Sequence, residues 1–224
     1  PQVTGGVRDT MAHARLVAER ELAAAVDNPV VATDGRVVSN GNFHGAPVAY
    51  ALDFLAIVVA DLASISERRT DRFLDVARNR GLNAFLADDP GVDSGHMIAQ
   101  YTQAGIVSEL KRNAHPASAD SIPSSAMQED HVSMGWAAGR KLRRSIDGLS
   151  RVLAIEILTA ARAIDMRGPA KPAPSTGAVI AKLRETIPGP GMDRYLAPEI
   201  SHAHEAVVSG QVVTVAEAAA GPLF

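Results

Sequence analysis

The sequence predicts an all-α fold, an elongated bundle of long helices with a small β-hairpin and loop near residues 30–46. Residues 128–166 contain no proline and repeat apolar residues at helical spacing. At about 1.5 Å per residue, such a helix would exceed ~50 Å, a length typical of elongated bundles. The stretch from Pro47 to about Val76 starts apolar on most sides, which indicates a buried helix. Residues 3–26 are rich in Ala, Leu, Glu and Arg without proline, which favours helix.

Turn residues divide the rest of the chain. The sequence "DNP" ends the first helix, because proline disfavours helix at the residue before it. Two β-branched runs in "VVATDGRVVS" predict a hairpin around Asp34 and Gly35. We expect one helical domain over 1–224, with a bundle core at 1–169 and a helical tail at 170–224 docked on it. The remaining predicted helices are 94–112, 176–187 and 193–209.

Composition excludes several classes of function. The 224 residues are 46% hydrophobic, enough for a sizeable core, and the net charge of −3 gives no electrostatic reason to expect nucleic acid or a membrane as partner. The apolar run "FLAIVVADLASI" is shorter than the ~20 residues of a membrane span. The absence of cysteine excludes disulfides and thiolate chemistry and fits a reducing compartment, so we expect a cytoplasmic protein.

The row "PSSAMQEDHVSMG" is the first candidate for chemistry. Ser125 followed by Gln128 matches a helix capping box, and acidic residues after it would suit the helix dipole. Neighbouring helical residues point about 100° apart, so Glu129 and His131 would diverge, and we expect no metal site. The third interpretation is a single functional carboxylate, from Glu129 or Asp130, that binds a cationic or N–H-bearing group. The residues alone leave capping and carboxylate function open.

The loop "NGNFHG" is the second candidate. It offers an amide (Asn42), a phenyl ring (Phe43) and an imidazole (His44) on a backbone that glycine allows to approach a ligand closely. The alternative is an ordinary Gly/Asn turn whose Phe43 fills the core.

Several motifs together resemble the histidine ammonia-lyases of the aromatic amino acid ammonia-lyase family. They are "SNGNFHGAPVAYALDFLAI" and "SIPSSAMQEDHVSMG", with "ISERRTDR", "GVDSGHMIAQYTQA" and "SELKRNAHPAS" between them, and "VLAIEILTAARAIDMR" after them. The opening "PQVTGGVRDTMAHARLVAERELAAAVDNPVV" is similar as well, so the resemblance covers essentially the whole chain.

The resemblance implies a helical bundle of the fumarase/aspartase-like superfamily, assembled as a homotetramer whose active sites draw on more than one subunit. It implies histidine degradation, by non-oxidative deamination of L-histidine to urocanate and ammonia. The cofactor would be a 4-methylidene-imidazol-5-one, formed autocatalytically from an internal Ala-Ser-Gly, with no metal. It would activate the substrate amine, or in an older view the ring, while a base removes a β-proton.

The resemblance also assigns residues. Glu129 corresponds to the glutamate that histidine-specific members place at the substrate, and Phe43 to the phenylalanine near the prosthetic group; we expect these two to be catalytic. Asn42, His44 and Gln128 match neighbouring positions and are expected to bind substrate. An ionised carboxylate at Glu129 suits the polar ring and ammonium group of histidine.

Two departures from the family pattern stand out. Met127 replaces a common Asn, and the chain contains no Ala-Ser-Gly. The chain also starts at Pro1, in the middle of the family's sequence. We therefore expect the C-terminal portion of a lyase, inactive alone, whose partner is the missing N-terminal part of the same protein.

Three alternatives remain. The chain could be an inactive remnant or interaction protein, or an ammonia-lyase or aminomutase for another aromatic amino acid. The motif "SSAM" also resembles a loop of the fumarase and argininosuccinate lyase group, but Asp130 stands where that loop carries lysine.

Overall fold

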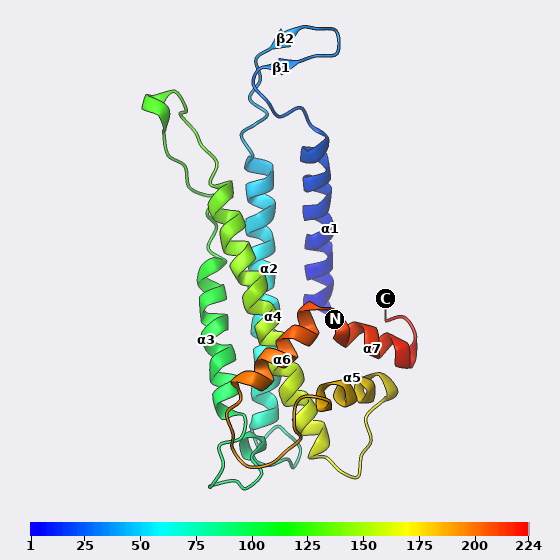
Figure 1. Cartoon of the computed structure of the whole chain (residues 1–224). Helices are drawn as coiled ribbons and strands as arrows, with labels where there is room; N and C mark the ends of the chain where they lie inside the picture. Colours follow the sequence, from blue (N-terminus) through cyan, green and yellow to red (C-terminus); the bar gives the residue numbers. More distant parts are fainter. Residues whose placement is uncertain (224) are drawn as a thin grey trace. The chain divides into compact units, whose positions relative to one another are not determined.

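The computed structural model describes residues 1–223 and is mainly helical, as predicted. Two antiparallel strands form the expected hairpin around a turn in which Gly35 has a φ of +83° (Figure 1). Glycine adopts this left-handed conformation without steric cost. The elements are α1 (Gln2–Ala23), β1 (Val30–Val31), β2 (Val37–Val38), α2 (Ala46–Leu74), α3 (Met97–Asn113), α4 (Gly135–Asp165), α5 (Pro174–Arg184), α6 (Ala197–Val208) and α7 (Gln211–Ala220).

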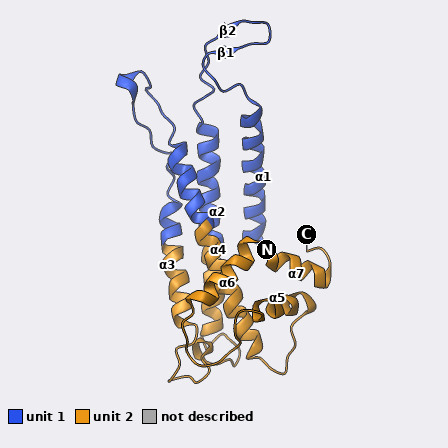
Figure 2. Cartoon of the chain, in the orientation of Figure 1, with its two compact units in different colours: residues 1–62, 109–146 blue, residues 63–108, 147–224 orange. Residues whose placement is uncertain are grey.

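The chain forms two compact units (Figure 2). Unit 1 comprises Pro1–Leu62 and Glu109–Ile146, and unit 2 comprises Ala63–Ser108 and Asp147–Phe224. Helices α2, α3 and α4 contribute residues to both units. The predicted division at residue 169 follows a different boundary and stays a prediction.

In unit 1, small residues let α2 and α4 approach closely. Ala49 and Ala138 are fully buried. A Cβ added at Gly135 would lie 3.5 Å from the Cβ of Ala49, and one added at Gly139 would lie 3.6 Å from a methyl group of Leu52. This packing holds the N-terminal halves of the two helices together, and each of these halves follows one of the two candidate loops.

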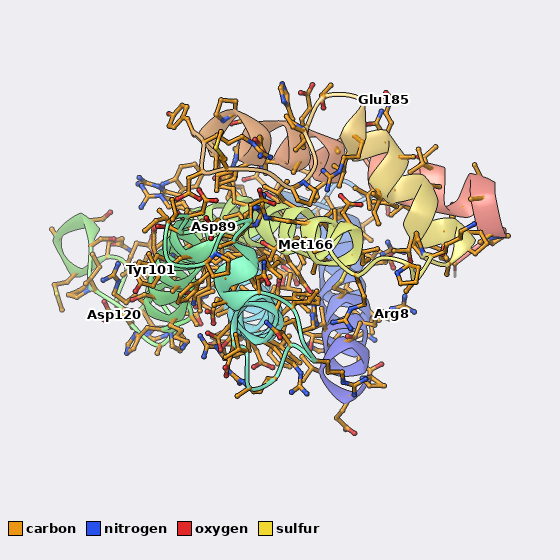
Figure 3. All side chains as sticks on the ribbon, turned by 90° about the horizontal axis from the view of Figure 1, so that it is seen from below. Arg8, Asp89, Tyr101, Asp120, Met166 and Glu185 are labelled. Atoms are coloured by element: carbon orange, nitrogen blue, oxygen red, sulfur yellow. The ribbon has the colours of Figure 1, made fainter. Side chains whose placement is uncertain are left out.

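In unit 2, the helices after residue 169 pack on the C-terminal half of α4. One core cluster joins Ala154, Leu158 and Ala161 of α4 to Leu183, Ile187 and Ala203. At the end of α4, Met166 packs against a second cluster (Figure 3). That cluster consists of Leu74, Leu82, Leu86 and Ala163.

A buried histidine belongs to the polar part of unit 2. His96 is 2% exposed, and its Nδ1 lies 3.0 Å from the Thr159 hydroxyl. Burial, followed by the positive charges of Arg162, Arg194 and Arg184, lowers the pKa of His96 to about 3. The imidazole is therefore neutral at ordinary pH and acts as a packed polar group.

The predicted start of the longest helix is wrong. Helix α4 begins at Gly135, and the residues from Gln128 to Met134 are not helical. Ser125, Ala126 and Met127 have φ values of 52°, 54° and 72°, in the left-handed region, which a right-handed helix does not admit. The expected capping box between Ser125 and Gln128 therefore does not exist.

Two further expectations need correction. Helix α2 is not buried on all sides, because Tyr50, Phe54 and Ile57 are 58%, 44% and 45% exposed. The last predicted helix ends near residue 208, and α7 follows it after Gly210, which has a φ of +76°. That second helix was missed.

Helix α2 is long and apolar enough to cross a membrane by length and composition alone. The core helix of a soluble protein passes the same test, and 39% of the relevant window is buried inside the molecule. Its Asp53, 3% exposed, is paired with Lys141 inside unit 1. The test therefore gives only weak support for a membrane span.

We predict that Gly95→Ala destabilises the protein much more than Gly91→Ala. Both glycines have positive φ values, +58° and +100°. A Cβ at Gly95 would lie 2.5 Å from the Phe85 carbonyl oxygen, whereas nothing lies within 4 Å of one at Gly91. We expect losses in the free energy of unfolding of about 2–4 kcal/mol and about 1 kcal/mol, respectively, in denaturant titrations. Equal losses would show that the close approach at Gly95 is unimportant.

Candidate active site

Two loops of unit 1 carry all the residues that the sequence singled out. The Phe43 loop (residues 39–45) connects β2 to α2, and the Glu129 loop (residues 114–134) connects α3 to α4. Both lie at the end of unit 1 where α2 and α4 begin (Figure 1). Packing between those helices thus places the two loops beside each other.

A buried carboxylate anchors the base of the Glu129 loop. Asp53 of α2 accepts a hydrogen bond of 2.7 Å from the Ser118 N–H and lies 3.0 Å from the Lys141 ammonium of α4. Lys141 also donates to the carbonyl of His115. The loop is therefore tied to both helices at its start.

The environment of Asp53 favours its charged form. Burial by itself raises the pKa of this carboxyl, but the hydrogen bonds from Ser118 and the ion pair with Lys141 outweigh burial, so the pKa lies below its ordinary value. Asp53 is thus a charged structural anchor at neutral pH.

The tip of the Glu129 loop is closed by backbone hydrogen bonds. The Ser124 N–H donates to the Glu129 carbonyl at 2.9 Å, and the Glu129 N–H donates to the Ser124 carbonyl at 3.2 Å. Between them lie the three left-handed residues, Ser125, Ala126 and Met127. Such conformations persist only where surrounding contacts enforce them, and they cluster at functional sites.

The Glu129 side chain is exposed and has no partner among residues 1–223. No hydrogen bond or ion pair in this part of the chain uses its carboxylate. Gln128 and Asp130 are also exposed. The expected helix-dipole effect on these residues is absent because they precede α4, but an unpaired carboxylate is still available to bind a cationic or N–H-bearing group.

The Phe43 loop is built on asparagine hydrogen bonds. The Asn42 side chain donates to the Ala25 carbonyl at 3.2 Å, and the Asn42 N–H donates to the Asn40 side-chain oxygen at 2.7 Å. Phe43 remains 49% exposed, so the interpretation of this ring as a core residue is wrong for this structure. The loop therefore exposes the Phe43 ring, whereas the Asn42 side-chain amide is hydrogen-bonded to the backbone.

The two loops meet at a pair of histidines. The rings of His44 and His131 stack with centroids 5.5 Å apart and planes 3° apart. The His44 Nε2 lies 2.8 Å from the His131 carbonyl oxygen, and the Ser133 hydroxyl donates to the His44 carbonyl at 2.7 Å. The structure thus joins the two motifs through residues next to Phe43 and close to Glu129.

Sequence analysis missed three of these contributors: the anchor pair, Asp53 and Lys141, and the role of Ser133. A usable signal existed for Asp53, since a carboxylate inside the apolar stretch "ALDFLAI" must find a partner. Nothing local identified that partner. Among residues 1–223, no cluster of three or more His, Asp or Glu side chains could hold a metal ion.

Comparisons with known proteins identify the family of this chain. A family model for aromatic amino acid lyases matches residues 1–185, and the chain belongs to this family. The resemblance inferred from the motifs is confirmed.

Individual relatives are more specific. The chain is 67% identical to the histidine ammonia-lyase of Streptomyces avermitilis, over 100% of this chain and 44% of the relative. The crystal structure of histidine ammonia-lyase from Trypanosoma cruzi has a TM-score of 0.93 and 41% identity, and covers 97% of this chain and 43% of that one. Tyrosine aminomutase from Streptomyces globisporus has a TM-score of 0.92 and 38% identity, with 97% and 41% covered. The chain spans less than half the length of these relatives.

We predict that Asp53→Asn lowers the free energy of unfolding by about 1–3 kcal/mol, because Lys141 loses its buried counter-charge. Asp34→Asn is the matched control, since Asp34 forms an exposed ion pair with Arg36 in the same unit. The free energy of unfolding of Asp34→Asn should stay at the wild-type value, because exposed ion pairs contribute little to stability. Denaturant titrations at neutral pH measure both, and equal effects would contradict the anchor role of Asp53.

The effect of Asp53→Asn should depend on pH. A folded-state pKa below the ordinary value means that the carboxylate stabilises the fold above the unfolded-state pKa of about 4. That stabilisation is lost as the pH falls through the folded-state pKa. The difference between wild type and variant should therefore shrink below about pH 4, and a constant difference would contradict an electrostatic origin.

Proposed function

We propose that this chain works as part of an ammonia-lyase that converts L-histidine to urocanate and ammonia. The observation that carries the proposal is the exposed, unpaired Glu129 carboxylate on a loop held against Phe43's loop. The high identity to proteins named histidine ammonia-lyase supports the choice of histidine over other amino acids.

The side chains of the site would each perform a simple task. Glu129 would accept hydrogen bonds from the ammonium group or the ring N–H of histidine, which phenylalanine lacks. Phe43, half exposed, would form an apolar wall that excludes water beside the reacting carbons. Gln128 is exposed and free to bind a polar group of the substrate, whereas Asn42 would act mainly by fixing the loop.

The family implies a methylidene-imidazolone prosthetic group, and the residues present fit it. The exposed Phe43 ring would contact this group, and the Glu129 carboxylate, unpaired among residues 1–223, would hold the amino acid beside it. When bound, the group supplies an electrophile that activates the amino group for departure. The Ala-Ser-Gly that forms it would lie in a segment of the protein outside the printed sequence.

The proposal extends to assembly and location. The exposed apolar residues of α2 (Tyr50, Phe54 and Ile57) support burial of this helix by further parts of the protein or by other subunits of a homotetramer. We further propose a cytoplasmic enzyme of histidine degradation.

The alternative, an aminomutase or lyase for another aromatic amino acid, draws on the high structural similarity to tyrosine aminomutase. Urocanate formation, followed by its ultraviolet absorbance, distinguishes the candidates. We expect no activity from the 224-residue chain alone and activity from a longer protein that carries both this chain and Ala-Ser-Gly. Urocanate from the chain alone would refute the proposal that this chain needs the segment carrying Ala-Ser-Gly. A longer protein that leaves histidine unchanged but converts tyrosine or phenylalanine would favour the alternative, and one that converts none of them would favour an inactive remnant or an interaction protein.

We predict that Glu129→Gln in the longer protein lowers turnover of histidine by at least about 100-fold, because an amide lacks the charge that holds the substrate. Asp130→Asn is the matched control, since this neighbouring exposed carboxylate is expected to contribute little. Steady-state kinetics, with size-exclusion chromatography to check assembly, measures both. If Glu129→Gln keeps near wild-type turnover, Glu129 has no role in the active site.

A further inference from the structure

The paired histidines connect the two site loops through three contacts. Stacked rings with parallel planes and centroids 5.5 Å apart are offset, the arrangement that aromatic pairs favour. One hydrogen bond runs from the ring of His44 to the backbone of His131, and another runs from the side chain of Ser133 to the backbone of His44. Each loop therefore donates one bond to the other.

These contacts fix the tautomer of His44. The His131 carbonyl can only accept a hydrogen bond, so the His44 Nε2 must carry the proton and donate it. This nitrogen is thus engaged with the protein and is not available to a substrate. The stacking covers one face of the ring as well.

The pair also lies beside the two expected catalytic residues in the sequence. Phe43 directly precedes His44, and Glu129 precedes His131 with Asp130 between them. A bond between the two histidines therefore limits how far the Phe43 ring and the Glu129 carboxylate can separate.

We propose that His44, His131 and Ser133 form a clasp that positions Phe43 and Glu129 relative to each other, and that His44 is a positioning residue, not a ligand of the substrate. This inference rests on the proposed function. It replaces the expectation that His44 binds substrate directly.

The test uses pairs of variants of the longer lyase that separate the ring from the hydrogen bond. His131→Phe keeps a stacking ring and the backbone carbonyl, whereas His131→Ala removes the ring. His44→Gln keeps an N–H donor, whereas His44→Phe keeps only the ring. We expect kcat/KM for histidine to fall about 3- to 10-fold in His131→Ala and His44→Phe and to be substantially retained in His131→Phe. His44→Gln also lacks the stacked ring, so its loss should match that of His131→Ala.

Two further readouts separate positioning from a direct role. Because the clasp acts as a unit, the double variant His44→Ala/His131→Ala should lose little more than His44→Ala alone. The pH profile of kcat/KM should keep its shape in His44→Phe, since no proton transfer passes through the clasp. Additive losses, a missing limb in the profile, or equal loss in His131→Phe and His131→Ala would overturn the proposal.

Two controls distinguish an effect on folding from an effect on function. Ser133→Ala removes only the hydroxyl donor to His44, so it tests the clasp if a histidine variant fails to fold; wild-type kcat/KM in this variant would then count against the clasp. Thermal unfolding of the same set measures the coupling between His44 and His131 without any assay of activity. If the wild-type protein leaves histidine unchanged, the proposed function fails; if it is active but the variants show no coupling, only the clasp fails.

Discussion

The buried carboxylate of Asp53 is the constraint on which the candidate site depends. A charge removed from water must be paired, and Asp53 accepts a hydrogen bond from the Ser118 N–H and forms an ion pair with the Lys141 ammonium. Because these partners belong to the loop and to α4, pairing the charge also fixes where the Glu129 loop leaves the helices. The alanine and glycine contacts between α2 and α4 supply the close packing that makes such pairing geometrically accessible.

With its base fixed by Asp53 and its end fixed by the histidine clasp, the Glu129 loop can hold a backbone that would be unfavourable in isolation. Three successive residues in the left-handed region, Ser125, Ala126 and Met127, cost of order 1–3 kcal/mol each. The two anchors oppose this cost. The result is an exposed Glu129 carboxylate that groups of residues 1–223 leave unpaired, available to a cationic or N–H-bearing partner.

Sequence reasoning succeeded where one local pattern governs one element. The hairpin around Asp34 and Gly35 and the helices α1 to α3 follow from turn residues, periodicity and proline placement. It failed at Gln128, where a capping sequence and a proline-free run both favoured helix. In the structure, Ser125, Ala126 and Met127, just before Gln128, instead have positive φ values, and α4 begins only at Gly135. It also missed α7, because Gly210 ends one helix and another begins directly after it.

The sequence by itself determined the family and the all-α class, and it singled out Glu129 and Phe43 as candidate site residues. Only the tertiary structure decided that His44 contacts His131, that Asp53 contacts Lys141, and that Phe43 lies in the open. The physical reason is that periodicity and capping report forces along one segment. Contacts between residues far apart in the chain depend on how helices pack, and a buried charge reveals that a partner is needed without revealing which one.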